Sequence, residues 1–272
     1  MLTLVLIVVI TALAFEYING FHDTANSIAT VVATKVLSPM QAVMLAATTN
    51  LLGALWGTAV AKTIASGLLD TGVVEVTSQL ILCALLGAIV WNLITWWKGL
   101  PSSSSHALIG GLCGAAVAAA NNNFHSVIWS HPADPWYKSA GVLWKVIVPM
   151  VSSPLLGFAA GFLVMGLLFA IISFMARSGG FLARMARPRW VNAFFGKAQL
   201  ASAAGMGFAH GMNDAQKTMG IIALALVGAQ SAGTLDNLQM FLLKEFFEIL
   251  EKAIDRCREA GVVAYEIVLK NS

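Results

Sequence analysis

The sequence predicts an all-α, polytopic membrane protein in which two parts of the chain are related as inverted repeats. Of its 272 residues, 58% are hydrophobic and only 11% are charged, whereas a soluble domain carries about 25% charged residues. Two short polar motifs, at 19–26 and 210–217, also match each other within otherwise apolar sequence. These observations indicate a chain embedded in lipid that carries two equivalent polar positions.

Long uncharged stretches predict the membrane spans. Each exceeds the roughly 20 residues that an α-helix needs to cross the hydrocarbon core. They are 36–61, 76–97, 99–133 and 146–176. The opening segment is also apolar, and it lacks a basic n-region and an Ala-x-Ala site. We therefore expect it to be a retained first span rather than a cleaved signal peptide.

A basic segment sets the predicted orientation. Residues 176–197 contain five Lys or Arg residues and no acid, and the positive-inside rule makes such a loop cytoplasmic. Assigning spans in both directions from this basic loop gives 1–36, 40–62, 78–97, 101–120, 144–175 and 198–232. The two polar motifs then lie in segments of opposite direction, as in inverted-topology repeats.

This count divides the chain into four parts. Residues 1–175 form a first transmembrane repeat with a serine-rich hairpin near 98–120, and 176–197 form the basic cytoplasmic loop. Residues 198–235 begin a second, inverted repeat. Residues 236–272 hold seven of the thirteen acids, and we expect an amphipathic helix over about 239–260 at the membrane surface.

The paired motifs align position by position. Asp23 aligns with Asp214, and Asn26 aligns with Lys217. An aspartate at the centre of a membrane helix costs roughly 2.5–3.5 kcal/mol on insertion scales, so we expect both to face one central cavity. We also expect helix breaks near 19–23 and 210–214, because free backbone groups at this depth can line a site. In the alternative interpretation, these polar groups only hydrogen-bond neighbouring helices.

A run of serines predicts a second element of the site. Pro101 and Ser102–Ser105 precede His106 at the start of a helix rich in glycine and alanine. Proline and serine are typical of helix starts, and a helix N-terminus suits an anion. We expect Ser103, Ser104 and Ser105 to cap this helix and to present hydroxyls to the same cavity. A role in helix packing alone is the alternative.

At these residues the sequence resembles the inorganic phosphate transporter (PiT) family. The resemblance rests on 20–30, 101–110 and 211–220, which follow one another in the family's order. It implies an inverted-repeat transporter fold with discontinuous helices and a re-entrant-type serine-rich hairpin. The family pattern continues with a second hairpin that does not follow residue 230 here. We therefore expect the second repeat to be incomplete.

The resemblance and the motifs together predict a set of site residues. Those expected to bind substrate are Asp23, Asn26, Ser103, Ser104, Ser105, Asn213, Asp214 and Lys217. Those expected to bind a coupling cation are Asp23, Asn26, Asn213 and Asp214.

These residues favour secondary transport of inorganic phosphate across the plasma (inner) membrane, with no enzymatic activity. Two carboxylates repel an oxyanion unless they are protonated or bound to a cation. Anion binding is then coupled to the cation. We expect symport with Na⁺ or H⁺, or uptake of a divalent metal bound with phosphate, and no other cofactor. The expected partners are phosphate and lipid, with homo-oligomers left open and nucleic acid excluded.

Three alternative functions differ from phosphate transport. The chain could carry another oxyanion such as sulfate, or be a truncated membrane fragment that does not transport. An intramembrane serine protease is disfavoured, because neighbours such as Ser105 and His106 point about 100° apart on a helix. The sequence also lacks a Gly-x-Ser-x-Gly elbow.

Overall fold

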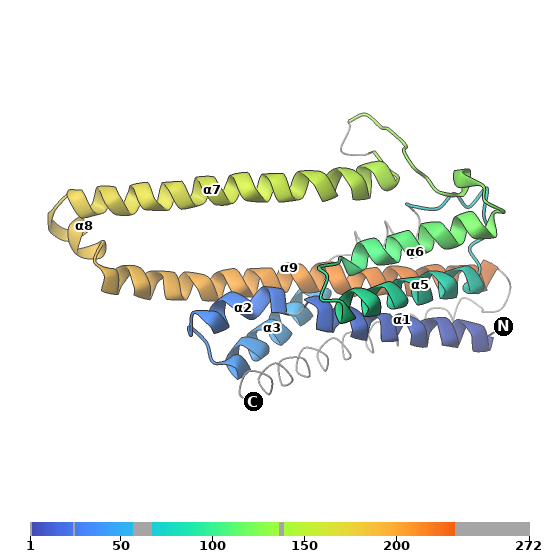
Figure 1. Ribbon diagram of the computed structural model, residues 1–272, viewed down its shortest axis with the longest axis horizontal. Helices are drawn as coiled ribbons and strands as arrows, with labels where there is room; N and C mark the ends of the chain where they lie inside the picture. The colour runs from blue at the N-terminus through green and yellow to red at the C-terminus, as the bar shows by residue number, and fades with distance from the viewer. Residues whose placement is uncertain (1, 24, 57–66, 136–138, 232–272) are drawn as a thin grey trace.

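The computed structural model describes residues 2–23, 25–56, 67–135 and 139–231, and this part of the chain is helical (Figure 1). Within these ranges the only β-type pairings are two isolated bridges, Leu69 with Val127 and His131 with Ala140. The all-α prediction is therefore confirmed for the described residues. The helices are α1 (Leu2–Asp23), α2 (Ala25–Ala33), α3 (Pro39–Ala54), α5 (Ser78–Trp97), α6 (Ser104–Ala119), the 3-10 turn η1 (Phe124–Ser126), the π-helical turn η3 (Leu143–Ile147), α7 (Val148–Arg177), α8 (Gly180–Met185) and α9 (Pro188–Ser231).

Three segments of the described chain are helical, long and apolar enough to cross a membrane. They are Thr3–Gly20, Ser78–Trp97 and Leu143–Arg177, and they correspond to three of the predicted spans. A fourth apolar helix, α6, is shorter, at 16 residues. At 1.5 Å per residue it measures roughly 24 Å, less than the roughly 30 Å of the hydrocarbon core. Its re-entrant insertion remains a prediction.

Side-chain caps explain where three helices begin. Ser38 caps α3 in a capping box with Gln41, and Pro39 follows in the first turn. Thr77 caps α5 by accepting a hydrogen bond from the backbone N–H of Leu80. Ser103 caps α6 by accepting from the backbone N–H of His106. A serine cap was predicted at this place, and the helix starts at Ser104, two residues earlier than the predicted start at His106.

The long helix α9 is the centre of the packing. It contacts α1, α2 and α3, while α5 packs against α1 and α6 (Figure 1). Buried apolar side chains from α1, α5, α6 and α9 meet in one core cluster, which includes Phe15, Ile81, Leu112 and Ile221. In Figure 1, α1 and α9 run in opposite directions, as the predicted topology requires.

Glycines bring α3 and α9 into close contact. A Cβ added to Gly211 would overlap the backbone of Asn50, and one added to Gly53 would overlap the backbone of Phe208. A Cβ on Gly207 would overlap the Thr49 hydroxyl. Small residues at such spacing let membrane helices approach closely. Gly211 of the second motif therefore has a packing role.

Helix α7 stands apart from this core. None of its residues is buried, and its principal contacts are with η3 and α8. Figure 1 shows it running antiparallel to α9, to which α8 connects it. A helix that is apolar on all sides is typical of a membrane span.

The predicted helix breaks have two outcomes. Near the first motif, α1 ends at Asp23 and α2 begins at Ala25, so a helix boundary lies next to the predicted position. At 210–214 the prediction is wrong, because α9 is continuous from Pro188 to Ser231. No proline follows Pro188 in this helix, and the polar side chains of the motif have partners that do not require an open backbone.

The predicted cytoplasmic loop 176–197 is also largely helical. It contains α8 and the first residues of α9, because basic residues favour an exposed helix as readily as a loop. The amphipathic helix predicted over about 239–260 lies outside the described residues, as do residues 232–235 of the predicted second repeat.

Candidate functional site

A cluster of polar side chains is buried between α1 and α9. Glu16 and Asn19 come from α1, and Asp214, Lys217 and Thr218 come from α9. None of the five is more than 5% exposed. Burying charged groups is costly unless they are paired and hydrogen-bonded, so the contacts within the cluster decide what it can do.

Asp214 is held on both sides by groups of its own helix. Lys217 Nζ lies 2.6 Å from Asp214 Oδ1, three residues further along α9. His210 Nε2 lies 3.2 Å from Asp214 Oδ2, one turn before it. The i,i+3 and i,i+4 spacings place these groups on one face of the helix, so Asp214 reaches both of them without a helix break.

Asn19 joins the two helices. Its Nδ2 donates to Asp214 Oδ2 at 3.1 Å and to Glu16 Oε1 at 3.5 Å. The Thr218 hydroxyl donates to Glu16 Oε2. One amide thus connects the carboxylate of α1 with the carboxylate of α9. Its own oxygen, Asn19 Oδ1, is buried without a hydrogen-bond partner among the described residues.

The cluster brings two carboxylic acids close to one lysine. Glu16 and Asp214 are the acids and Lys217 is the lysine among these five buried side chains. Two carboxylates in one buried cluster favour the binding of a proton or a cation, because like charges close together are unfavourable.

The predicted residues of the second motif divide into two groups. Asp214 and Lys217 lie in the buried cluster, whereas Asn213 is exposed on α9. Neighbouring residues of a helix point about 100° apart, which explains the separation. Asp23 and Asn26 lie outside the residues whose side chains are described, so their predicted position in a common cavity remains a prediction.

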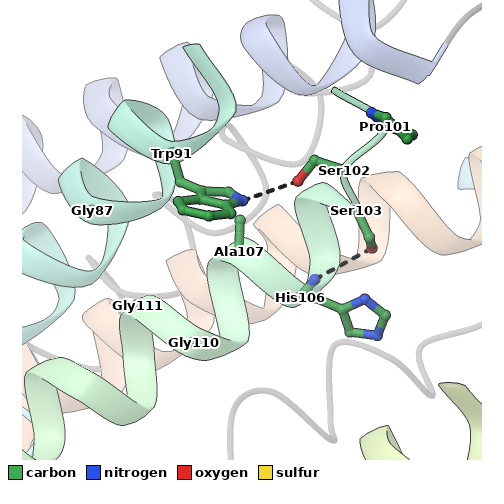
Figure 2. Close-up of a pocket in the computed structure, with 9 residues that line it drawn as sticks. All are labelled: Gly87, Trp91, Pro101, Ser102, Ser103, His106, Ala107, Gly110 and Gly111. Carbon is green, nitrogen blue, oxygen red and sulfur yellow. Dashed lines mark hydrogen bonds between the residues drawn. The ribbon is translucent and has the colours of Figure 1, made fainter. Parts of the chain in front are cut away.

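The serine run forms a pocket between α5 and α6. It has a volume of about 630 Å³ and is lined by Gly87, Trp91, Pro101, Ser102, Ser103, His106, Ala107, Gly110 and Gly111 (Figure 2). The Trp91 indole Nε1–H donates to the Ser102 hydroxyl at 3.0 Å. The Ser103 hydroxyl accepts from the His106 N–H at 3.4 Å.

The three predicted serines do not share one environment. Ser103 is exposed and lines the pocket, while Ser104 is buried and is not among the lining residues. Ser105 is half-buried and also lies outside the lining set. Successive side chains of a helix leave it in different directions, so a run of serines cannot present all its hydroxyls to one cavity.

Sequence reasoning missed Glu16 as a member of the site. It is the only acid in the apolar segment Thr3–Gly20, and it is fully buried. Like Asp23 and Asp214, Glu16 is an ionisable residue within a predicted membrane span, and such a residue indicates a function. It was overlooked because it lies outside the matched motifs.

The comparisons with known proteins identify the family. Residues 19–253 match the sequence model of the phosphate transporter family, PHO4. The chain belongs to this family. Its members are transport proteins rather than enzymes, and the chain is a multi-pass protein of the plasma membrane.

Several curated relatives with similar sequences are named as phosphate transporters. A probable low-affinity inorganic phosphate transporter of Bacillus subtilis is 44% identical over 232 residues, covering 84% of this chain and 62% of the relative. The probable low-affinity inorganic phosphate transporter of Mycobacterium leprae is 46% identical over 226 residues, covering 83% of this chain and 49% of the relative. The probable low-affinity inorganic phosphate transporter of Streptomyces halstedii is 46% identical over 213 residues, covering 78% of this chain and 87% of the relative. The chain spans about half the length of the mycobacterial relatives.

A solved structure supports the fold. It is titled "The sodium-dependent phosphate transporter" and aligns with a TM-score of 0.70 at 20% identity, covering 96% of this chain and 78% of that one. At this identity the likeness concerns the fold alone.

Proposed function

We propose that this chain takes part in secondary transport of inorganic phosphate, coupled to a cation. The observation that carries the proposal is the buried cluster of Glu16, Asn19, Asp214, Lys217 and Thr218, in a member of the phosphate transporter family. The coupling ion is Na⁺ or H⁺, or a divalent metal that enters together with phosphate.

Charge compensation provides the coupling. Two unit charges 4 Å apart interact by about 4 kcal/mol at an effective dielectric constant near 20. A phosphate that approaches either carboxylate is repelled by an energy of this order. A proton or metal cation on the cluster removes the repulsion, so each ligand raises the affinity for the other. An energy of this size corresponds to roughly a thousandfold change in phosphate affinity.

The pocket at the start of α6 offers donors for the anion. Hydroxyl groups of Ser102 and Ser103 line it together with His106, and Ser103 marks the N-terminus of α6. Free backbone N–H groups and the positive end of the helix dipole favour an anion at such a place. The family resemblance adds Ser105, Asp23, Asn26 and Asn213 to the proposed phosphate and cation ligands, whereas Ser104 is buried outside the pocket.

Uptake into proteoliposomes tests this proposal. The purified 272-residue chain is reconstituted, and accumulation of radiolabelled phosphate is measured under an inward Na⁺ gradient, an inward proton gradient, or neither. We expect accumulation under one of the gradients only, with a much smaller effect of unlabelled sulfate than of unlabelled phosphate. Equal competition by sulfate would indicate a general oxyanion carrier.

The control separates coupling from leakage. Glu16→Gln removes the fully buried carboxylate that the Thr218 hydroxyl contacts, and it should weaken the response to the gradient. If neither gradient drives accumulation in the unsubstituted chain, and phosphate does not bind to it, the proposal is wrong. The chain would then be a membrane protein of this family that does not transport phosphate alone.

A further inference from the structure

The two matched motifs differ at one chemically important position. Three residues after the aspartate, the first motif has Asn26 and the second has Lys217. Glycine and aspartate occupy the same spacing in both, as Gly20 with Asp23 and Gly211 with Asp214. The second motif thus carries a basic side chain where the first carries a neutral amide.

The Lys217 ammonium is placed where a free cation would bind Asp214. Its Nζ lies 2.6 Å from Asp214 Oδ1, and the lysine is 5% exposed. On the other carboxylate oxygen, Asn19 Nδ2 lies at 3.1 Å and His210 Nε2 at 3.2 Å. Hard cations bind to oxygen ligands, whereas these three contacts all bring nitrogen atoms to the carboxylate.

We infer that Lys217 is a tethered counter-cation of Asp214, which closes this carboxylate to exchangeable metal ions. A metal ion beside Asp214 would be repelled by the ammonium already there, and a buried lysine has no solvent into which it can move. The exchangeable positive charge of the cluster is therefore held elsewhere. Lys217 sets how many free cations accompany each phosphate, and in this respect the inference rests on the proposed transport function.

Cation binding in the absence of phosphate tests the inference. The purified chain is unfolded by heat in NaCl or in choline chloride of equal ionic strength, followed by tryptophan fluorescence. Lys217→Asn gives the second motif the residue that the first motif has. This variant should unfold earlier than the unsubstituted chain in choline, and Na⁺ should raise its midpoint by roughly 2–4 °C or more beyond any response of the unsubstituted chain.

Two controls identify the new site. Lys197→Asn makes the same substitution at an exposed lysine of the same helix, and it should leave the Na⁺ response unchanged. Asp214→Asn combined with Lys217→Asn removes the carboxylate that Na⁺ would occupy, and it should abolish the added response. A Lys217→Asn variant whose Na⁺ response equals that of the unsubstituted chain would overturn the inference.

A second measurement does not depend on folding of the Lys217→Asn variant. Binding of radioactive ²²Na⁺ is compared between the unsubstituted chain and Asp214→Asn combined with Lys217→Met, which removes both members of the pair and leaves the net charge of the cluster unchanged. The inference predicts equal binding, because Asp214 holds no exchangeable ion. Loss of a bound Na⁺ in this double variant would refute it. Neither measurement uses phosphate. Each therefore tests cation binding at Asp214 even if the proposed transport function is wrong.

Discussion

Replacing Gly211 by alanine tests whether the contact between α3 and α9 holds the second motif in place. The added methyl group would overlap the carbonyl oxygen, carbonyl carbon and Cα of Asn50. All three are backbone atoms, so no side chain can rotate to make room. The two helices must therefore separate. This separation also weakens the contacts that Gly53 and Gly207 make where α3 crosses α9.

The expected magnitude follows from two opposing terms. Alanine is better than glycine in a helix by about 1 kcal/mol, whereas overpacking costs typically 1–3 kcal/mol. Because the overlapping atoms of Asn50 belong to the backbone, we take the upper end of the overpacking cost, about 3 kcal/mol. The net loss of stability is then about 2 kcal/mol, which lowers the unfolding midpoint by roughly 4–8 °C at the rate of 2–4 °C per kcal/mol.

Gly205 provides the matched control on the same helix. A Cβ built there meets nothing within 4 Å, so Gly205→Ala should leave the midpoint unchanged or raise it by a few degrees. Both variants are measured by thermal unfolding in detergent, followed by tryptophan fluorescence. Equal shifts for Gly205→Ala and Gly211→Ala would show that the crossing is looser than described and that the motif glycine has no packing role.

The remaining predictions concern charge and the serine pocket. Asp214→Asn should lower stability by about 3–5 kcal/mol, because it leaves the Lys217 ammonium buried and unpaired. Adding Lys217→Met should recover most of this loss in denaturant unfolding, and no recovery would mean that the pair is not the cause. Glu16→Gln keeps the shape of the side chain that contacts Thr218, yet it should weaken the dependence of phosphate uptake on the driving gradient. Full dependence in that variant would place the coupling site elsewhere. Ser103→Ala should cost about 1 kcal/mol through loss of the helix cap and should weaken phosphate binding, measured by calorimetry. Ser104→Ala, at a residue buried outside the pocket, should leave phosphate binding unchanged. A larger loss of binding in Ser104→Ala than in Ser103→Ala would show that phosphate binds outside the pocket.

Spans defined by composition were predictable. The predicted span 78–97 agrees with α5, Ser78–Trp97, because an uncharged run there follows a threonine cap and ends at Lys98. The span 144–175 agrees similarly with Leu143–Arg177. Asp214 is buried, which avoids the cost of placing a carboxylate in lipid, whereas its predicted position in one cavity with Asp23 remains a prediction.

Features that depend on how helices face one another were not predictable. Glycine, asparagine and aspartate at 211–214 gave local signals for a helix break, and α9 nevertheless continues through them. The reason is tertiary, since Gly211 packs against the backbone of Asn50 and Asp214 finds partners on α9 and α1. Pairing of Glu16 with Thr218 depends on the rotation and register of two helices, which one sequence does not specify.

The glycine crossing and the charged cluster are parts of one arrangement on α9. Gly207 and Gly211 face α3, while His210, Asp214 and Lys217 lie on the adjoining face, from which Asp214 contacts Asn19 of α1. Close packing on the first face fixes the rotation of α9 about its axis. That rotation decides whether Asp214 reaches Asn19 or faces lipid, where the carboxylate would be strongly unfavourable. Stability of the α3–α9 contact is therefore a condition for the cluster, and Gly211→Ala should disturb cation binding as well as unfolding, although Gly211 lies outside the cluster.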